Sequence, residues 1–260
     1  MITFSIVTIT YNAASVLQPT LDSVFMQDYE HIEHLIIDGA SKDDTVSMAE
    51  AYKKKVAEAD DLRRVTIVSE PDNGLYDAMN KGLRMATGDY VLFLNAGDRL
   101  PSADTLSAVA LVAEPGDGEE MPAVVYGNTD IVDIGGHFIR HRRLQPPEKL
   151  TWRSFKWGML VCHQAFYART DIAKMFPYDT RFRHSADVDW CIKVMKEGER
   201  RGLALRPVHR VVALFLQGGD TMANHNDSLQ ERFQVMRRHY GLLQTVLLHG
   251  WFLLRSFYKK

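Results

Sequence analysis

The feature that most constrains this chain is a regular alternation of short apolar runs and helix-patterned segments over its first hundred residues. Runs rich in Val, Ile and Leu have the length of β-strands, and a segment with helical periodicity separates each from the next. The strand segments are 4–10, 34–37, 65–68 and 90–94, and the helical segments are 15–27, 45–59 and 76–86. This β-α-β-α order predicts an α/β fold with a doubly wound, mostly parallel sheet.

The rhythm changes after residue 113, where a loop rich in Gly and Pro spans 114–121. Segments 123–133 and 137–143 flank Gly135-Gly136 and predict a hairpin. Further on we expect a strand at 160–168, a helix at 189–197, one strand or two within 203–216, and helices at 228–240 and 242–258 broken at Gly241. We therefore expect one domain over 1–260, with a parallel half (1–113), a mixed half (114–222) and C-terminal helices (223–260), since no long linker separates the halves.

Composition excludes several classes of protein. The 260 residues carry a formal net charge of -2, whereas a dedicated nucleic-acid binder needs a basic surplus, so we expect no nucleic-acid partner. Cys162 and Cys191 are too few for a disulfide framework and form no CxxC pair, which favours a reducing, cytoplasmic location. The apolar start reads as a strand rather than a signal peptide, and no stretch has the length to span a bilayer.

Asp38 and Asp98 both lie where an apolar strand run stops. Ligands of open α/β sheets bind beyond the carboxyl ends of the strands, so we expect both acids to face one crevice. One suits a base N–H, and the other suits a divalent cation that carries a diphosphate. The structural alternative is that each acid caps the following helix. No GxGxxG or GxxxxGK[ST] follows the first strand, which disfavours a dinucleotide site or a P-loop.

Longer motifs surround these acids. They are Ser5-Ile-Val-Thr-Ile-Thr-Tyr-Asn12, Ile37-Asp-Gly-Ala-Ser-Lys-Asp-Asp-Thr45, Ser69-Glu-Pro-Asp-Asn-Gly-Leu-Tyr-Asp-Ala-Met-Asn-Lys-Gly82 and Gly88-Asp-Tyr-Val-Leu-Phe-Leu-Asn-Ala-Gly-Asp98. In order and spacing they resemble family 2 glycosyltransferases of the GT-A fold, near the bacterial colanic-acid and exopolysaccharide transferases. The resemblance covers roughly residues 3–100 and is looser to about 220.

The resemblance implies a donor site for a nucleotide sugar. Its residues would be Thr8, Tyr11, Asn12, Asp38, Asp72, Lys81, Asn95 and Asp98. The structural alternative for Lys81 is a solvated helix face. Asp98 would bind Mg²⁺ or Mn²⁺, with His209 as a further ligand, although a lone His before a strand is more often structural. Where the family commonly has an Asp-x-Asp-Asp run, this chain has Asn95-Ala96-Gly97-Asp98, so only the last acid remains.

Direct displacement of a diphosphate also needs a base for the acceptor hydroxyl. Within Ser185-Ala-Asp-Val-Asp-Trp190 the family commonly carries Glu-Asp, and here Asp187 retains the acid. We predict Asp187 as the base, Asp189 as second choice, and His163 and Gln164 in the acceptor pocket. The structural alternative is that both acids only stabilise the first turn of a helix. Gly218-Gly219-Asp220-Thr221 predicts a loop over the donor.

The predicted function is inverting, non-processive transfer from a UDP-sugar to a saccharide or lipid-linked saccharide in surface polysaccharide biosynthesis. Its alternatives are a catalytically inactive GT-A-like nucleotide-binding or scaffold protein, and a sugar nucleotidyltransferase, which would need a basic glycine-rich loop. The segment 242–260 combines Leu, Phe and Trp with terminal cations. It is typical of a helix on the inner face of the cytoplasmic membrane, or of one packed on the body or on a second subunit of a homodimer.

Overall fold

A computed structural model describes residues 1–59, 62–218 and 225–257. The strands are β1 Phe4–Thr10, β2 Ile32–Asp38, β3 Arg64–Ser69, β4 Tyr90–Phe93, β5 Val124–Val132, β6 Phe138–His141, β7 Phe166–Arg169 and β8 Leu205–Leu216. The α-helices are α1 Ala14–Phe25, α2 Thr45–Glu58, α3 Leu75–Met85, α4 Thr105–Ala113, α5 Thr170–Ala173, α6 Ala186–Arg200, α8 His225–Tyr240 and α9 Leu242–Phe257. Two 3-10 helices, η1 Trp152–Trp157 and η2 His163–Ala165, complete the described part.

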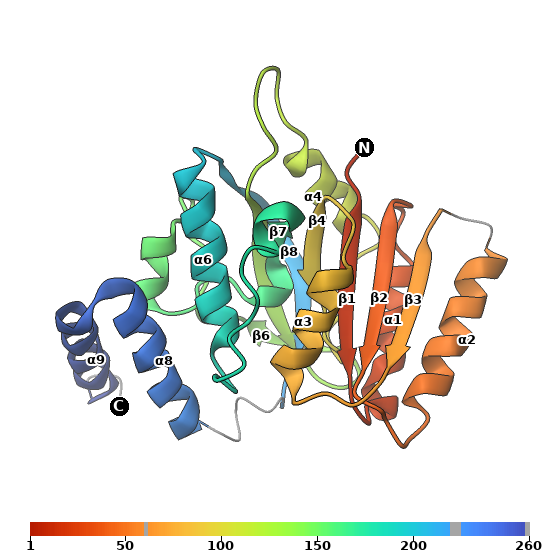
Figure 1. The fold of residues 1–260 in the computed structure, drawn as a ribbon, viewed down its shortest axis with the longest axis horizontal. Coiled ribbons are helices and arrows are strands. Elements are labelled where there is room, and N and C mark those ends of the chain that lie inside the picture. Colours follow the sequence, from red (N-terminus) through yellow and green to blue (C-terminus); the bar gives the residue numbers. More distant parts are fainter. Residues whose placement is uncertain (60–61, 219–224, 258–260) are drawn as a thin grey trace.

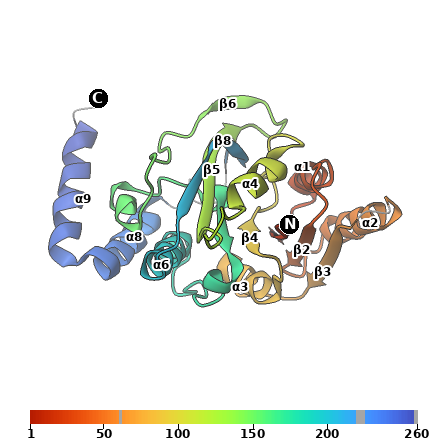
Figure 2. The ribbon, with the colours of Figure 1, turned by 90° about the horizontal axis from the view of Figure 1, so that it is seen from above.

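One sheet runs through the molecule in the order β3-β2-β1-β4-β7-β5-β6, with β8 paired to β5. Strands β1 to β4 are parallel, which confirms the predicted doubly wound half. Their carboxyl ends lie along the lower edge in Figure 1. Helices α1, α2 and α4 cover one face of the sheet and α3 and α6 the other, as the view from above shows (Figure 2). This layering places the loops after β1, β2, β3 and β4 on one edge.

The second half is antiparallel where it joins the first. Strand β7 pairs antiparallel with both β4 and β5, and β5 with β6, which confirms the predicted hairpin. The strand expected at 160–168 is wrong in its first half, because β7 begins only at Phe166 and η2 occupies 163–165. Val161 and Ala165 are buried there without strand pairing, so their apolar character reflects packing of a turn against the core. The segment 203–216 contains one strand, β8, whose pairing with β5 shifts register between Tyr126 and Thr129.

The core is continuous across the β4–β7 junction. Trp190 of α6 packs edge-on against Phe93 of β4 and Phe166 of β7, with ring centroids 5.6 and 5.8 Å apart. Trp190 also stacks on Tyr178 at 5.0 Å. Because a buried aromatic contributes large apolar contact area, this cluster fixes the position of α6 relative to the parallel half.

The C-terminal helices α8 and α9 break at Gly241, whose φ of +83° suits glycine, as expected from the sequence. In Figure 1 they lie beyond α6, at the end of the molecule remote from α2. The exposed side of α9 carries apolar residues at helical spacing, namely Leu242, Leu243, Val246, Leu247 and Trp251. Apart from Gly218, the loop predicted at 218–221 lies outside the described residues, as do 258–260. Among the described residues, no helix has the length and apolarity to cross a bilayer.

Candidate active site

A pocket of about 840 Å³ opens at the carboxyl ends of β1 and β4. It is lined by Ile9, Thr10, Tyr11, Asn12, Ala13, Val16, Gly39, Pro71, Asp72, Gly74, Leu75, Asn95 and Ala96. The lining thus includes Tyr11, Asn12, Asp72 and Asn95 from the predicted donor site. Tyr11 is 66% exposed, so its ring is free to cover a planar ligand.

Asp38 lies behind this pocket and is buried. Its carboxylate accepts hydrogen bonds from the Thr10 hydroxyl at 3.0 Å, the Ser69 hydroxyl at 2.7 Å, and both the backbone N–H and the hydroxyl of Ser41. Burial alone would raise the pKa of Asp38, but these hydrogen bonds outweigh it and hold the pKa below its ordinary value. Asp38 therefore organises the turn after β2 as a fixed negative charge.

Asp72 is the acid that lines the pocket itself. Its Oδ1 accepts the Gly74 N–H at 2.8 Å. Its Oδ2 lies over Gly39, where an added Cβ would sit 2.6 Å from that oxygen and 3.2 Å from the Tyr11 ring. Because Gly39 has no side chain, the side chains of Asp72 and Tyr11 can both approach the backbone of this turn. A larger residue at position 39 would clash with them, which is why a glycine follows Asp38. Asn12, at φ +47°, accepts the Lys42 N–H at 2.8 Å and fixes the opposite rim.

Two predicted donor residues are held elsewhere. Thr8 is fully buried, and its hydroxyl lies 2.9 Å from Nε2 of His34, whose Nδ1 lies 2.9 Å from the Tyr52 hydroxyl. It sits two residues inside β1, roughly 7 Å short of the strand end, and packs under α2. Lys81 donates to the Pro71 carbonyl at 2.7 Å and pairs with Glu70 at 3.0 Å, so its ammonium secures the loop that carries Asp72.

A second group of polar side chains surrounds Asp187 in the first turn of α6. Oδ1 of Asp187 accepts the Tyr76 hydroxyl at 3.1 Å and the Val188 N–H at 2.9 Å, and Oδ2 lies 3.3 Å from Nδ1 of His163. Nε2 of His163 lies in turn 3.4 Å from Nδ2 of Asn95. The structure thus brings the predicted base, one predicted acceptor residue and the end of β4 into one chain of contacts.

These contacts set the charge of Asp187. Burial by itself would raise its pKa, but the bonds from His163, Val188 and Tyr76 prevail and the pKa lies below the ordinary value. A carboxylate at a helix N-terminus is also favoured by the helix dipole. Asp187 is therefore ionised near neutral pH and able to accept a proton.

Asp98 points into the protein instead of toward the pocket. It is 4% exposed, and its carboxylate accepts the Gln164 amide at 2.9 Å and the Leu216 N–H at 3.1 Å. Burial raises the pKa of Asp98 to about 6 against the lowering effect of these bonds. Gln164, predicted in the acceptor pocket, is itself buried and serves Asp98.

Asp189, the second choice for the base, faces away from Asp187. It is buried and pairs with Lys193 at 2.6 Å, His239 at 2.8 Å and Arg238 at 3.1 Å. Two residues along a helix do not share a face, which explains the separation. The carboxylate of Asp189 is thus engaged by three cations and ties α6 to α8, so the structure does not support Asp189 as the base.

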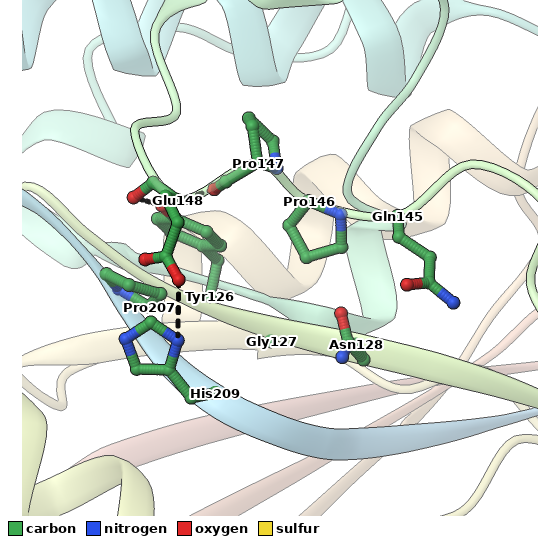
Figure 3. A pocket seen from close by; sticks show the side chains of 9 residues that line it. All are labelled: Tyr126, Gly127, Asn128, Gln145, Pro146, Pro147, Glu148, Pro207 and His209. Atoms are coloured by element: carbon green, nitrogen blue, oxygen red, sulfur yellow. Dashed lines mark hydrogen bonds and ion pairs between the residues drawn. The ribbon is translucent and has the colours of Figure 1, made fainter.

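His209 belongs to a different pocket, of about 240 Å³, shown in Figure 3. Its imidazole faces Glu148, with 3.9 Å between Nδ1 and Oε1, and is 61% exposed on its side chain. It precedes Leu216, the residue bonded to Asp98, by seven positions along β8, or roughly 20 Å. His209 and Asp98 therefore do not share a metal site, and the predicted pair is corrected.

The donor set at the β4 turn does not fit a tightly held divalent cation. Mg²⁺ and Mn²⁺ favour free carboxylate oxygens, whereas Asp98 is turned inward and Gly97 has no side chain. Asn95 offers its Oδ1, a buried oxygen that has no hydrogen-bond partner among the described residues. Over the residues that the structure describes, no three side chains of His, Cys, Asp or Glu gather into a metal-binding group.

Sequence reasoning missed four residues that complete these sites within the quoted motifs. Thr10, Ser41 and Ser69 donate hydrogen bonds to Asp38, and Tyr76 donates one to Asp187. All four lie within the motifs quoted above, so the motifs could have pointed to them. Arg232 of α8, whose Nε is buried without a hydrogen bond in the described part of the chain, stood in no motif.

Comparison with known proteins gives a consistent result. The family model for glycosyl transferase family 2 matches residues 5–176. A "PGL/p-HBAD biosynthesis glycosyltransferase" of Mycobacterium bovis BCG is 36% identical over 255 residues, covering 95% of this chain and 90% of the relative. The "amylovoran biosynthesis glycosyltransferase AmsB" of Erwinia amylovora is 26% identical over 211 residues, covering 80% of this chain and 68% of that one.

Solved structures share the fold. TarS 1–349 of S. aureus in complex with UDP-GlcNAc matches with TM-score 0.68 at 18% identity, covering 98% of this chain and 72% of that chain. Against another TarS 1–349 structure this chain spans 63% of that chain. The mannosyltransferase PcManGT of Pyrobaculum calidifontis in complex with GDP-Man and Mn²⁺ matches with TM-score 0.67 at 19% identity, covering 95% and 70%. These GT-A neighbours confirm the predicted fold class.

Proposed function

The chain belongs to glycosyl transferase family 2, and from that premise we propose that it transfers a sugar from a nucleotide-sugar donor to an acceptor hydroxyl with inversion and without processivity. The observation that carries the proposal is the placement of an ionised carboxylate, Asp187, beside His163 and Asn95 at the edge that holds the nucleoside-sized pocket. A base and a donor pocket at one edge are what direct displacement requires.

The acceptor oxygen attacks the anomeric carbon while Asp187 takes the hydroxyl proton on its carboxylate. The bond between that carbon and the diphosphate oxygen breaks, and the electron pair leaves with the nucleoside diphosphate. His163 and Tyr76, each in contact with Asp187, hold the carboxylate in orientation. One displacement on the face opposite the leaving group inverts the anomeric centre.

The donor assignment rests on the pocket at the ends of β1 and β4. Its exposed tyrosine and its acid, Tyr11 and Asp72, suit a base ring and its N–H groups. Neighbours of the same fold were solved with UDP-GlcNAc and GDP-Man. We propose UDP as the nucleotide and a hexosyl or hexosaminyl group as the sugar.

The names of two relatives support the acceptor class that we propose. Proteins named for PGL/p-HBAD biosynthesis and for amylovoran biosynthesis are 36% and 26% identical to this chain. We propose a role in surface polysaccharide biosynthesis, with a saccharide or lipid-linked saccharide as acceptor.

Helix α9 supports a peripheral membrane contact. Leu243, Leu247 and Trp251 recur every four residues and are 76%, 66% and 55% exposed, and Arg255, Lys259 and Lys260 follow in the sequence. Such an apolar stripe with neighbouring cations suits an anionic leaflet. Co-sedimentation with phosphatidylglycerol vesicles that is lost in Leu247→Glu supports it. A concentration-dependent dimer that the same variant dissociates, without vesicle binding, assigns the stripe to a second copy.

The deciding experiment is a panel of UDP-, GDP- and TDP-sugars assayed for nucleoside diphosphate release with a mixture of saccharide acceptors. Each donor is tested with Mn²⁺, with Mg²⁺ and with a chelator, because a neighbour of the same fold was solved with Mn²⁺. Release that requires an acceptor supports the transferase. Nucleotide binding without release from any donor would favour an inactive nucleotide-binding protein instead.

A further inference from the structure

Arg232 of α8 is a partly buried cation whose charge interacts with that of the proposed base, Asp187. Its Nε is buried and forms no hydrogen bond with the residues that the structure describes. The neighbouring Glu231 fixes this stretch of α8, since its carboxylate accepts the N–H groups of Arg183 and His184, both at 2.7 Å. Those residues directly precede α6, so the clamp holds Arg232 next to the helix turn that carries Asp187.

The charged groups that act on Arg232 are one acid, Asp187, and one further cation, Arg142. Burial lowers the pKa of Arg232, while the negative charge of Asp187 raises it and the positive charge of Arg142 lowers it. Arg142 reaches the same region from the chain after β6, where its Nη1 donates to the carbonyls of Leu144 and Leu160 at 2.7 and 3.3 Å. Both guanidinium groups keep their charge near neutral pH, while the Glu231 carboxylate in the same corner is engaged by the backbone N–H groups of Arg183 and His184.

A buried guanidinium with an unused donor is costly for the protein alone. Such a group is stabilised when an anion binds, because charge-assisted bonds from arginine to phosphate oxygens are short and strong. The nearby turn Asn95–Asp98 supplies no free carboxylate to carry a divalent cation. Charge that develops on a departing diphosphate needs another source of stabilisation here.

We propose that Arg232, supported by Arg142, forms the cationic subsite that takes the diphosphate of the donor. This proposal rests on the proposed function, because it assumes a nucleotide-sugar donor. Arg142 lies in the second half of the chain and Arg232 on α8, whereas the nucleoside pocket belongs to the first half. The diphosphate therefore bridges the halves, and the same residues stabilise it as it leaves.

The test compares ligands with and without phosphate on the full chain. Binding of UDP, uridine and inorganic pyrophosphate is measured by calorimetry for the wild type, Arg232→Gln, Arg232→Lys and Arg142→Gln. We expect Arg232→Gln to weaken UDP and pyrophosphate about 10- to 100-fold and to leave uridine unchanged, the size of one or two lost charge-assisted bonds. Arg232→Lys keeps the charge and should retain part of the affinity. Arg237→Gln, an exposed arginine on the same helix, is the matched control.

Each contrary result has a distinct meaning. Equal loss of UDP and uridine affinity in Arg232→Gln would overturn the proposal and give Arg232 a structural role. Unchanged UDP affinity with a raised KM for a phosphorylated acceptor would overturn it too, and would move the cation to the acceptor side. If the wild type binds no nucleoside diphosphate, with or without Mn²⁺, the proposed function fails together with the subsite. If the wild type binds UDP and Arg232→Gln binds it equally well, only the proposed subsite is overturned.

Discussion

Asp38 and Asp187 stand at the same edge of one sheet, yet they are held by different kinds of contact. The donors to Asp38 come from the two neighbouring strands and from its own turn, at most 31 positions away. Asp187 is bonded by Tyr76, 111 positions earlier, and by His163 from η2. The nucleoside pocket is thus a product of adjacent βα units, whereas the centre around Asp187 exists only once α3, η2, α6 and β4 have packed together.

This comparison predicts that the two regions fail in different ways when changed. Substitutions at the Asp187 centre should alter turnover with little change in donor affinity. Substitutions in the nucleoside pocket should do the reverse, and substitutions in the contacts that join α6 to α8 should act on stability.

The largest effect is expected for Asp187→Asn. The amide cannot take the acceptor proton, so turnover should fall by about 10²- to 10⁴-fold, the usual contribution of a general base. Donor affinity measured by calorimetry should stay within a few-fold of the wild type. Near-normal turnover would remove Asp187 from the role of base, and a parallel loss of donor affinity would erase the proposed difference between the two regions.

Asp189→Ala should act on the fold instead of on catalysis. Removing this buried acid leaves Lys193 and His239 without their carboxylate partner and Arg238 with Asp179 alone, and breaking a buried ion pair typically costs about 3–5 kcal/mol. The paired carboxylate has its pKa lowered to about 2, so its stabilisation is present above about pH 4 and is lost as pH falls toward 2. Urea unfolding at pH 7 and pH 3 measures both statements. Glu50→Ala, on an exposed face of α2, is the control and should change neither.

Asp98→Asn should change how stability depends on pH. The folded-state pKa of about 6 exceeds the ordinary 3.8, so the folded protein binds more protons than the unfolded chain between these values. Wild-type stability due to this group therefore falls as pH rises from about 4 to 6, by up to about 3 kcal/mol. The variant lacks this loss, and its stability relative to the wild type should rise across that window. Parallel stability curves from pH 4 to 7 would show that Asp98 does not titrate there.

The smallest effect is expected for Gly39→Ala. The new Cβ would displace Asp72 and crowd Tyr11, and because both side chains can move, we expect only a loss of about three- to tenfold in nucleotide affinity. Turnover at saturating donor should be unchanged. Gly116→Ala, in the loop after α4, is the matched control. A fall in saturated turnover equal to the fall in affinity would mean that the two regions are coupled.

The sequence predicted much of the first half and less of the second for a physical reason. Strands β1, β2 and β4 are buried apolar runs and β3 is a partly exposed run at the edge of the sheet, and the hydrophobic pattern with its turn signals located all four. The same pattern misplaced the start of β7, because Val161 and Ala165 are buried in a turn and periodicity cannot tell a buried turn from a strand. Thr8 was assigned to the donor by its motif, although its side chain lies one pleat too deep in β1 to reach the pocket.

By itself, then, the sequence determined the α/β order, the acids at the strand ends and the family to which they belong, since these depend on local pattern and on motif spacing. Only the tertiary structure decided which acids face a ligand. It turned Asp98 inward to Gln164, gave Asp189 to the cations of α8, and set Asp187 beside His163 with Arg232 nearby. Those outcomes depend on which side chains from distant segments can pair in a buried space. Pairing of that kind is decided by packing and desolvation, neither of which a single stretch of sequence contains.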